Sequence, residues 1–352
     1  MYPAGFQIGN MDLQQADIAE AARPVSEQDW VRVLARYSQP STMRSALEIV
    51  VTIIPLALLW FAAWWSLSVS YLLTLLFTVP AAGLVVRLFL IQHDCGHGAF
   101  FENRTVNEWV GRLLGVLTLT PYDVWRRAHA IHHASSGNLD RRGVGDLDTL
   151  TVTEYQSLPP FRRFAYRVYR HPIVMFGIGP AYLFLFEHRI PKGQMTKGWM
   201  PWLSTMGTNV GIAIFAAGMI ALVGAPTFFL IHLPIVSLAA SMGVWLFYVQ
   251  HQFEDTYWAP GGNWSLKEAA LHGSSHYDLP RPLRWMTANI GVHHVHHLVS
   301  RIPFYRLPQV LRDYPELAAI GRITIPDSIR LVKLKLWDES QRRLVSFREA
   351  HG

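Results

Sequence analysis

Hydrophobic residues in this 352-residue chain gather in two long uncharged stretches, and the segments around them mix polar and apolar residues. Residues 49–86 and 198–253 contain no Asp, Glu, Lys or Arg. A helix that crosses the hydrocarbon core of a bilayer needs about 20 apolar residues, so each stretch predicts two membrane-spanning helices joined by a turn. We therefore expect four spans in two hairpins, at about residues 49–65, 70–90, 205–223 and 227–249.

The pattern also predicts the division of the chain. Residues 1–48 are expected to form a polar lead-in, residues 49–300 the membrane domain, and residues 301–352 a tail with a soluble pattern. Residues 12–37 of the lead-in can form an amphipathic helix. Alternating polar and apolar residues at 332–337 predict a short strand in the tail.

Two further apolar segments, residues 111–122 and 173–186, are too short to cross a bilayer. We expect both to form helices that lie at the membrane interface. No repeat, low-complexity tract or linker indicates a second domain.

Composition and charge exclude an ordinary soluble enzyme. Hydrophobic residues make up 51% of the chain and charged residues only 16%. All 31 Lys and Arg residues lie outside the two hairpin turns, so the basic segments are expected on one, cytoplasmic side, with both termini. The net charge of +6 fits contact with anionic lipid rather than nucleic acid. The start lacks the pattern of a cleaved signal peptide, and the single cysteine, Cys95, fits a reducing compartment.

Histidines supply the candidate chemistry. Nine of the 16 lie in three clusters, all in segments expected on the cytoplasmic side: His93 and His97; His129, His132 and His133; and His293, His294, His296 and His297. Residues three and four apart share one helix face, and imidazole is a ligand of transition metals. If only one of the neighbours His293 and His294 takes part, the clusters offer eight imidazole nitrogens. Eight nitrogens are more than one metal ion can bind, which indicates a dinuclear centre.

The spacing leaves one alternative open, because either His293 or His294 can partner His297. A single pair of histidines four apart is weak, since short motifs often match by chance. Three clusters on one membrane face are much stronger evidence for a functional site, because ionisable residues near a membrane are energetically costly and usually mark such sites.

These motifs carry a resemblance. The segments HDCGH (93–97), HAIHH (129–133) and HHVHH (293–297) resemble the three histidine boxes of the membrane fatty acid desaturase family. The surrounding segments, such as NRTVNEWVGRLLGVLTLTPYDVWRRAHAIHHASSGNLD, resemble the acyl-lipid, omega-6 or delta-12 branch. The similarity extends from about residue 49 to about residue 315.

The resemblance implies an all-α integral membrane protein with four transmembrane helices in two hairpins and a cytoplasmic helical cap that carries a histidine-rich di-iron site. It implies an enzyme that uses O2 and two electrons to remove two hydrogens from an acyl chain of a membrane lipid. A ninth ligand just after the last span would be His251. The implied metal ligands are His93, His97, His129, His132, His133, His251, His293, His296 and His297.

Acidic residues near these histidines are expected to orient the imidazole rings by accepting their N–H groups. Asp94, Glu254 and Asp255 are the first candidates, and Asp123, Asp140 and Asp146 are further ones. Cys95 is expected to be a small packing residue, and His232 inside the fourth span a hydrogen-bonded packing residue.

Electrons must come from a separate partner, because no GxGxxG motif follows a predicted strand and no HPGG segment indicates a fused cytochrome b5 module. A ferredoxin or cytochrome b5-like donor docking on the basic face is our hypothesis. The expected location is a bacterial inner membrane. A hydroxylase or ketolase acting on a lipid, carotenoid or alkane is the nearest alternative, and a non-catalytic haem or metal-carrying membrane protein is the alternative from another class.

Overall fold

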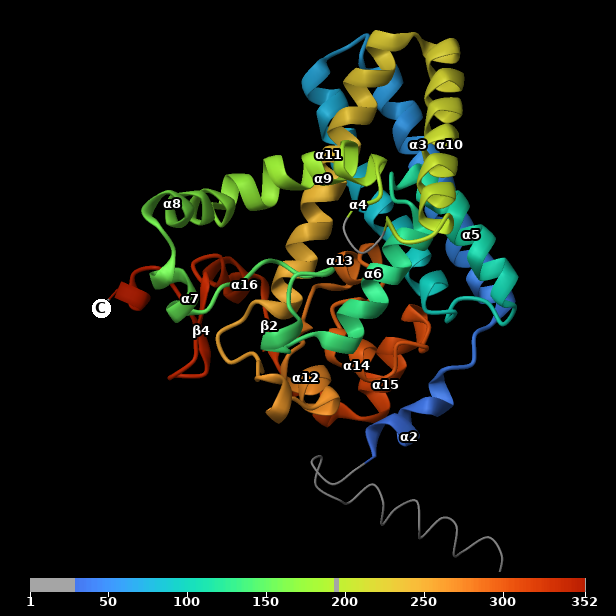
Figure 1. The fold of residues 1–352 in the computed structure, drawn as a ribbon. Coiled ribbons are helices and arrows are strands. Elements are labelled where there is room, and N and C mark those ends of the chain that lie inside the picture. The colour runs from blue at the N-terminus through green and yellow to red at the C-terminus, as the bar shows by residue number, and fades with distance from the viewer. Residues whose placement is uncertain (1–28, 193–195, 352) are drawn as a thin grey trace, which may run out of the picture.

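Helices make up most of the fold in the computed structural model, which describes residues 29–192 and 196–351 (Figure 1). The helix expected over residues 12–37 falls largely outside the described residues. Its last part forms α2 (Trp30–Leu34) and a 3-10 turn, η1 (Ala35–Tyr37). Asp29 begins α2, because its side chain accepts a hydrogen bond from the Arg32 amide.

Four helices of the described residues are long and apolar enough to cross a membrane, as expected. They form two hairpins that run side by side (Figure 1). The first hairpin consists of α3 (Thr42–Ser66) and α4 (Tyr71–Gly96), and the second of α10 (Met200–Val223) and α11 (Ala225–His251). The turn of the second hairpin is Gly224, whose positive φ of 84° suits a residue without a side chain.

The central span is α4, which packs against α3, α5 and α11. Its side chains from Ala81 to Cys95 are almost all buried, whereas α10 exposes large apolar side chains such as Ile214 and Leu222. An apolar surface of this kind suits a helix that faces lipid. Near its lower end, α4 is joined to α3 by an ion pair between the buried Arg87 and Glu48.

Shorter helices lie between the two hairpins in the sequence. They include α5 (Arg104–Leu117), α6 (Tyr122–Ser135), α8 (Pro160–Tyr169), the π-helical turn η3 (Val174–Ile178) and α9 (Gly179–Leu185). Of these, α8 and α9 lie across the direction of the spans (Figure 1). The helix expected at residues 173–186 is therefore present as η3 and α9. The prediction of a single helix over residues 111–122 is wrong, because α5 ends at Leu117 and α6 begins after Pro121. Between them Leu119 has a φ of 55°, which a helix does not allow.

The remaining elements form a cap at the histidine-bearing ends of α4 and α11 (Figure 1). Its helices are α7 (Val152–Ser157), α12 (Leu266–His272), α13 (Arg281–Met286), α14 (His293–Leu298), α15 (Leu307–Asp313) and α16 (Ile325–Leu331). Its 3-10 turns are η2 (Leu139–Arg141), η6 (Gly261–Asn263), η7 (Phe304–Arg306), η8 (Pro315–Ala319) and η9 (Glu349–His351). A further 3-10 turn, η4 (Glu187–Arg189), follows α9 and packs against α10.

Two small two-stranded sheets join segments of the cap. β1 (His276–Tyr277) pairs in parallel with β2 (Arg322–Ile323), and β3 (Leu336–Asp338) pairs antiparallel with β4 (Arg343–Val345). The strand expected at residues 332–337 therefore begins later, at Leu336, and its partner was not anticipated. In the second sheet Trp337 lies opposite Leu344, and both side chains are buried.

Candidate metal centre

Four helices bring nine histidines to one place. His93 lies in the last turn of α4, and His97 is the residue that caps this helix. His129, His132 and His133 lie on α6, and His251 ends α11. The short helix α14 carries His293, His296 and His297. The spacings of three and four residues put the rings of each helix on one face, as the sequence predicts.

The nine side chains form two groups, each of which could hold a metal ion. The first group consists of His93, His97, His129, His133 and His296, and the second of His132, His251, His293 and His297.

Neighbouring Nε2 atoms in the first group are very close. The distance is 3.0 Å between His129 and His97, and 3.1 Å between His133 and His129. His296 lies 3.2 Å from His133. Two nitrogen ligands at about 2.0–2.1 Å from one metal ion and at right angles lie about 3 Å apart, so the spacing of this group suits a metal ion with several ligands.

The rings of the second group also turn their Nε2 atoms toward one another. The Nδ1 of His251 lies 3.1 Å from the carbonyl oxygen of Gly273, which can only accept, so Nδ1 carries the proton and Nε2 a lone pair. The Nδ1 of His132 contacts the carboxylate of Asp146. The Nε2 atoms of His132 and His251 lie 3.2 Å apart. Together with His293 and His297 they place four candidate ligand nitrogens within 4.8 Å of one another, a spacing that suits a metal ion.

Two carboxylates orient rings of the centre. Asp94 lies 3.2 Å from the Nδ1 of His93, and its other oxygen accepts a hydrogen bond of 2.7 Å from the backbone amide of Phe304. Asp94 therefore joins the end of α4 to the segment that follows α14. Asp146 contacts the Nδ1 of His132 in the same way. From the sequence, Asp146 is expected only as one of the further candidates. Such contacts fix the tautomer of a histidine ligand.

The other acidic candidates have different surroundings. Glu254 is exposed and forms an ion pair of 2.5 Å with Arg343, and Asp255 is exposed as well. Among the described residues neither of them shares a hydrogen bond with a histidine. Asp123 pairs with Arg112 at 3.0 Å, and Asp140 accepts a hydrogen bond from the Gly261 amide.

The structure also distinguishes His293 from His294. His293 points into the second group, whereas the buried ring of His294 faces His276 with 5.8 Å between the ring centroids. Burial lowers the pKa of His294 to about 3, so the ring is neutral. Cys95 is buried in the core, as expected of a packing residue. His232 stacks on Phe228 within α11, but the hydrogen bond expected of its ring is not seen among the described residues.

Burial keeps six rings of the candidate centre in their neutral form, which is the form that binds metals. Burial is the largest cause that lowers the pKa values of six rings well below the usual value, and neighbouring histidines lower them further. These rings are His97, His129, His133, His293, His296 and His297.

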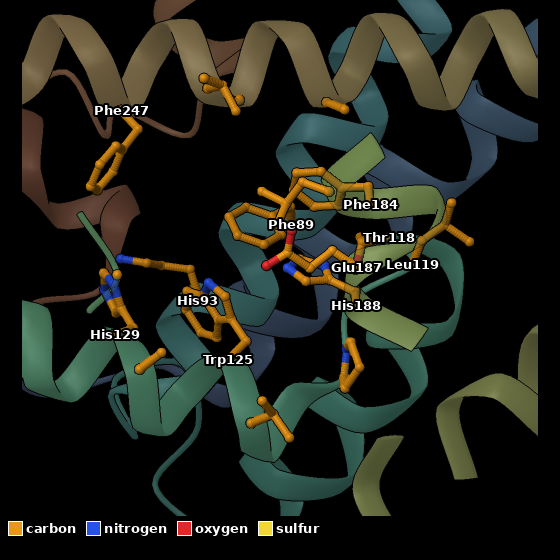
Figure 2. A pocket seen from close by; sticks show the side chains of 18 of the residues that line it. Phe89, His93, Thr118, Leu119, Trp125, His129, Phe184, Glu187, His188 and Phe247 are labelled. Carbon is orange, nitrogen blue, oxygen red and sulfur yellow. The ribbon is translucent and has the colours of Figure 1, made fainter. Parts of the chain in front are cut away.

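A cavity of about 750 Å³ reaches the histidines. Figure 2 shows His93, His129, Trp125 and Phe247 at one end of it, and Thr118, Leu119, Glu187 and His188 at the other. Its lining is mostly apolar, and the ring of Trp125 stacks on His129 with 4.7 Å between the centroids. A mostly apolar cavity that reaches candidate metal ligands suits a flexible hydrocarbon chain.

Sequence reasoning did not identify the walls of this cavity. On α11 the lining includes Ala239, Ala240 and Gly243. Small residues four apart on a membrane helix were the available signal, but they normally indicate close helix packing. Here a side chain added at Gly243 would meet open space.

Comparisons with known proteins agree with this geometry. A sequence profile of the fatty acid desaturase family matches residues 69–325, which include all nine histidines. The chain is 46% identical over 316 residues to a Bacillus subtilis protein named fatty acid desaturase, covering 90% of this chain and 89% of that protein.

Two proteins of Synechocystis sp. are more distant. One is named sn-1 acyl-lipid omega-3 desaturase (ferredoxin), and is 30% identical over 62% of this chain and 61% of its own length. The other is named sn-1 oleoyl-lipid 12-desaturase, and is 24% identical over 69% of this chain and 67% of its own length.

Proposed function

Because the chain belongs to the fatty acid desaturase family, we propose that it introduces a double bond into an acyl chain of a membrane lipid at a di-iron centre. We place the new bond at the delta-12 or omega-6 position. The motifs around the boxes support this branch, and the two Synechocystis relatives are named for position 12 and for omega-3. The observation that carries the proposal is the convergence of nine histidines into two groups, in each of which the candidate ligand nitrogens all lie within 4.8 Å of one another.

The metal ligands in this proposal are the nine histidines in their two groups, one group for each ion. Neutral nitrogen donors suit iron and other transition metals far better than magnesium or calcium. Iron bound there would supply the oxidant that an unactivated C–H bond requires.

The proposed reaction removes one hydrogen from each of two neighbouring methylene carbons and forms a carbon–carbon double bond between them. O2 takes up these two hydrogens, two further protons and two electrons from an external donor, and becomes two water molecules. The protein itself holds the chain in the apolar cavity beside His93 and His129 and keeps water away from the reacting carbons. Asp94 and Asp146 hold two of the rings in the required tautomer.

The donor and the topology complete the proposal. We place both termini and the histidines on the cytoplasmic side of a bacterial inner membrane, because the basic residues avoid the hairpin turns. A ferredoxin or cytochrome b5-like protein would deliver the electrons on that face. The ferredoxin in the name of one Synechocystis relative supports a carrier of this kind.

Expression in a host that lacks polyunsaturated lipids tests the function. Mapping of the double bonds in the host lipids should show a new diene with the wild type and none with His132→Ala. The control His272→Ala should retain activity, because His272 is half exposed and lies outside both groups. An added hydroxyl or keto group in place of the double bond would favour the hydroxylase or ketolase alternative. Unchanged lipids in the presence of an active donor would refute both enzymatic functions.

A further inference from the structure

The two walls of the cavity differ in chemistry. Away from His93 and Gln250, the lining along α4 and α11 is apolar and includes aliphatic side chains such as Val85, Val86, Val236, Ala239 and Ala240. Around the end of α5, η4 and the start of α10 the lining also contains polar side chains, namely Thr118, Glu187, His188, Lys192 and Thr205. Figure 2 shows Glu187, His188 and Thr118 together at the end away from His129. Thr118 donates to Gln92 and Glu187 pairs with Lys192, whereas a pure hydrocarbon chain would leave the hydroxyl of Thr205 and one nitrogen of His188 without a partner among the described residues.

One of these groups is fully buried and unpaired. Thr205 is only 1% exposed, and its Oγ1 has no hydrogen-bond partner among the described residues. The Nδ1 of His188, buried at the same end, also lacks a partner in the described part of the chain. Burial lowers the pKa of His188 to about 4, so this ring is neutral. A buried hydroxyl without a partner is unfavourable, so one that lines a cavity indicates a ligand atom that completes it.

This polar end is also where the cavity reaches the surface. Ile190 and Lys192 line it, and the side chains of both are more than half exposed. Among the described residues Lys192 forms one loose ion pair, with Glu187 at 3.8 Å, and an exposed pair of this kind is weak. The ammonium group is therefore free to meet an anionic group outside the mouth.

The distance from this end to the histidines suits an acyl chain. On α6 the lining runs from Pro121, next to the polar end, to His129. Eight residues of helix at 1.5 Å each amount to about 12 Å. Several methylene groups therefore fit between the polar end and the candidate metal centre.

We propose that Thr205 donates a hydrogen bond to the carbonyl oxygen of the acyl ester or thioester, and that Lys192 faces the phosphate of its carrier. The inference rests on the proposed function and specifies its substrate: an acyl group on a phosphate-bearing carrier. The methyl end enters first and lies against the aliphatic wall of α4 and α11. The position of the new double bond is therefore counted from the carboxyl end of the chain.

Thr205→Val removes the hydroxyl and keeps the shape of the side chain. Thr208→Val is the matched control, because Thr208 lies one turn further along α10, is also buried and already donates to the Ser204 carbonyl. In nanodiscs of phosphatidylglycerol with the full-length enzyme and its donor, we expect Thr205→Val to raise KM roughly three- to tenfold. We expect kcat to stay within about twofold, and part of the product to carry its double bond one or two carbons away from the wild-type position.

Chain length tests the direction. With acyl chains of different lengths, the wild type should place the double bond at a constant distance from the carboxyl end. A constant distance from the methyl end would overturn the inference, and so would equal KM values and a single identical isomer from Thr205→Val and Thr208→Val. Parallel assays with phosphatidylglycerol and with acyl-CoA identify the carrier, and Lys192→Glu should raise KM for the carrier that is used. A wild type that forms no double bond at all would instead refute the proposed function.

Discussion

Replacing Asp146 with Asn tests how the centre holds its metal. The carboxylate of Asp146 accepts the Nδ1–H of His132, whose side chain is fully buried. The side chain of Asp146 is 20% exposed, so solvent screens this contact only in part. Loss of such a partner typically lowers metal affinity 10- to 100-fold, or by about 1.4–2.7 kcal/mol. We expect Asp146→Asn to fold and to lose iron from the second group at a correspondingly lower concentration of a ferrous chelator.

The matched control is Asp148→Asn, which removes the same charge from the same loop two residues away. Iron retained by each purified variant across a chelator series gives the affinity ratio. If the two variants lose iron at the same chelator concentration, the effect is one of net charge, and the orienting contact between Asp146 and His132 does not tune the metal site.

Three further predictions concern the cavity, the donor and pH. Gly243→Leu should shorten the longest acyl chain that is accepted, because a side chain there enters open space in the cavity. Analysis of the products from acyl chains of different lengths checks this prediction, and an unchanged range of accepted lengths contradicts it. Reversing the charges of Arg126, Arg141 and Arg162 should lower donor-dependent turnover at low salt. Reversing the charge of the exposed Arg330 on α16 is the control and should not lower it. Equal turnover by the triple variant and the control variant rules out a basic docking face. The melting temperature of iron-free protein should fall as the pH drops below about 6.5, because the unfolded chain protonates histidines that burial keeps neutral in the fold; a flat profile between pH 7 and 5 would contradict this.

Much of the membrane fold follows from the sequence, because the absence of charge is a local signal. Residues 49–86 and 198–253 contain no charged residue, and the four long apolar helices lie where these stretches predict them. The ends of the helices were less predictable. Helix α4 continues to Gly96, ten residues beyond the uncharged stretch, because Arg87 is buried against Glu48 and Asp94 is held by the Phe304 amide.

The histidine spacing predicts which rings share a helix face, but not how the helices combine. The structure divides the rings of α6 between the two groups, with His129 and His133 in one and His132 in the other. It also turns His294 toward His276, which the spacing alone left open. These outcomes depend on contacts between distant segments, as do the cavity and the β3–β4 sheet, and no short-range pattern encodes them.

The location of bound metal tests the central claim most directly. We predict that anomalous scattering at the iron edge from crystals of the iron-loaded enzyme will show two peaks. One should lie among the nitrogens of His93, His97, His129, His133 and His296, and the other among those of His132, His251, His293 and His297. A single peak, or peaks away from these two groups, would contradict a di-iron centre.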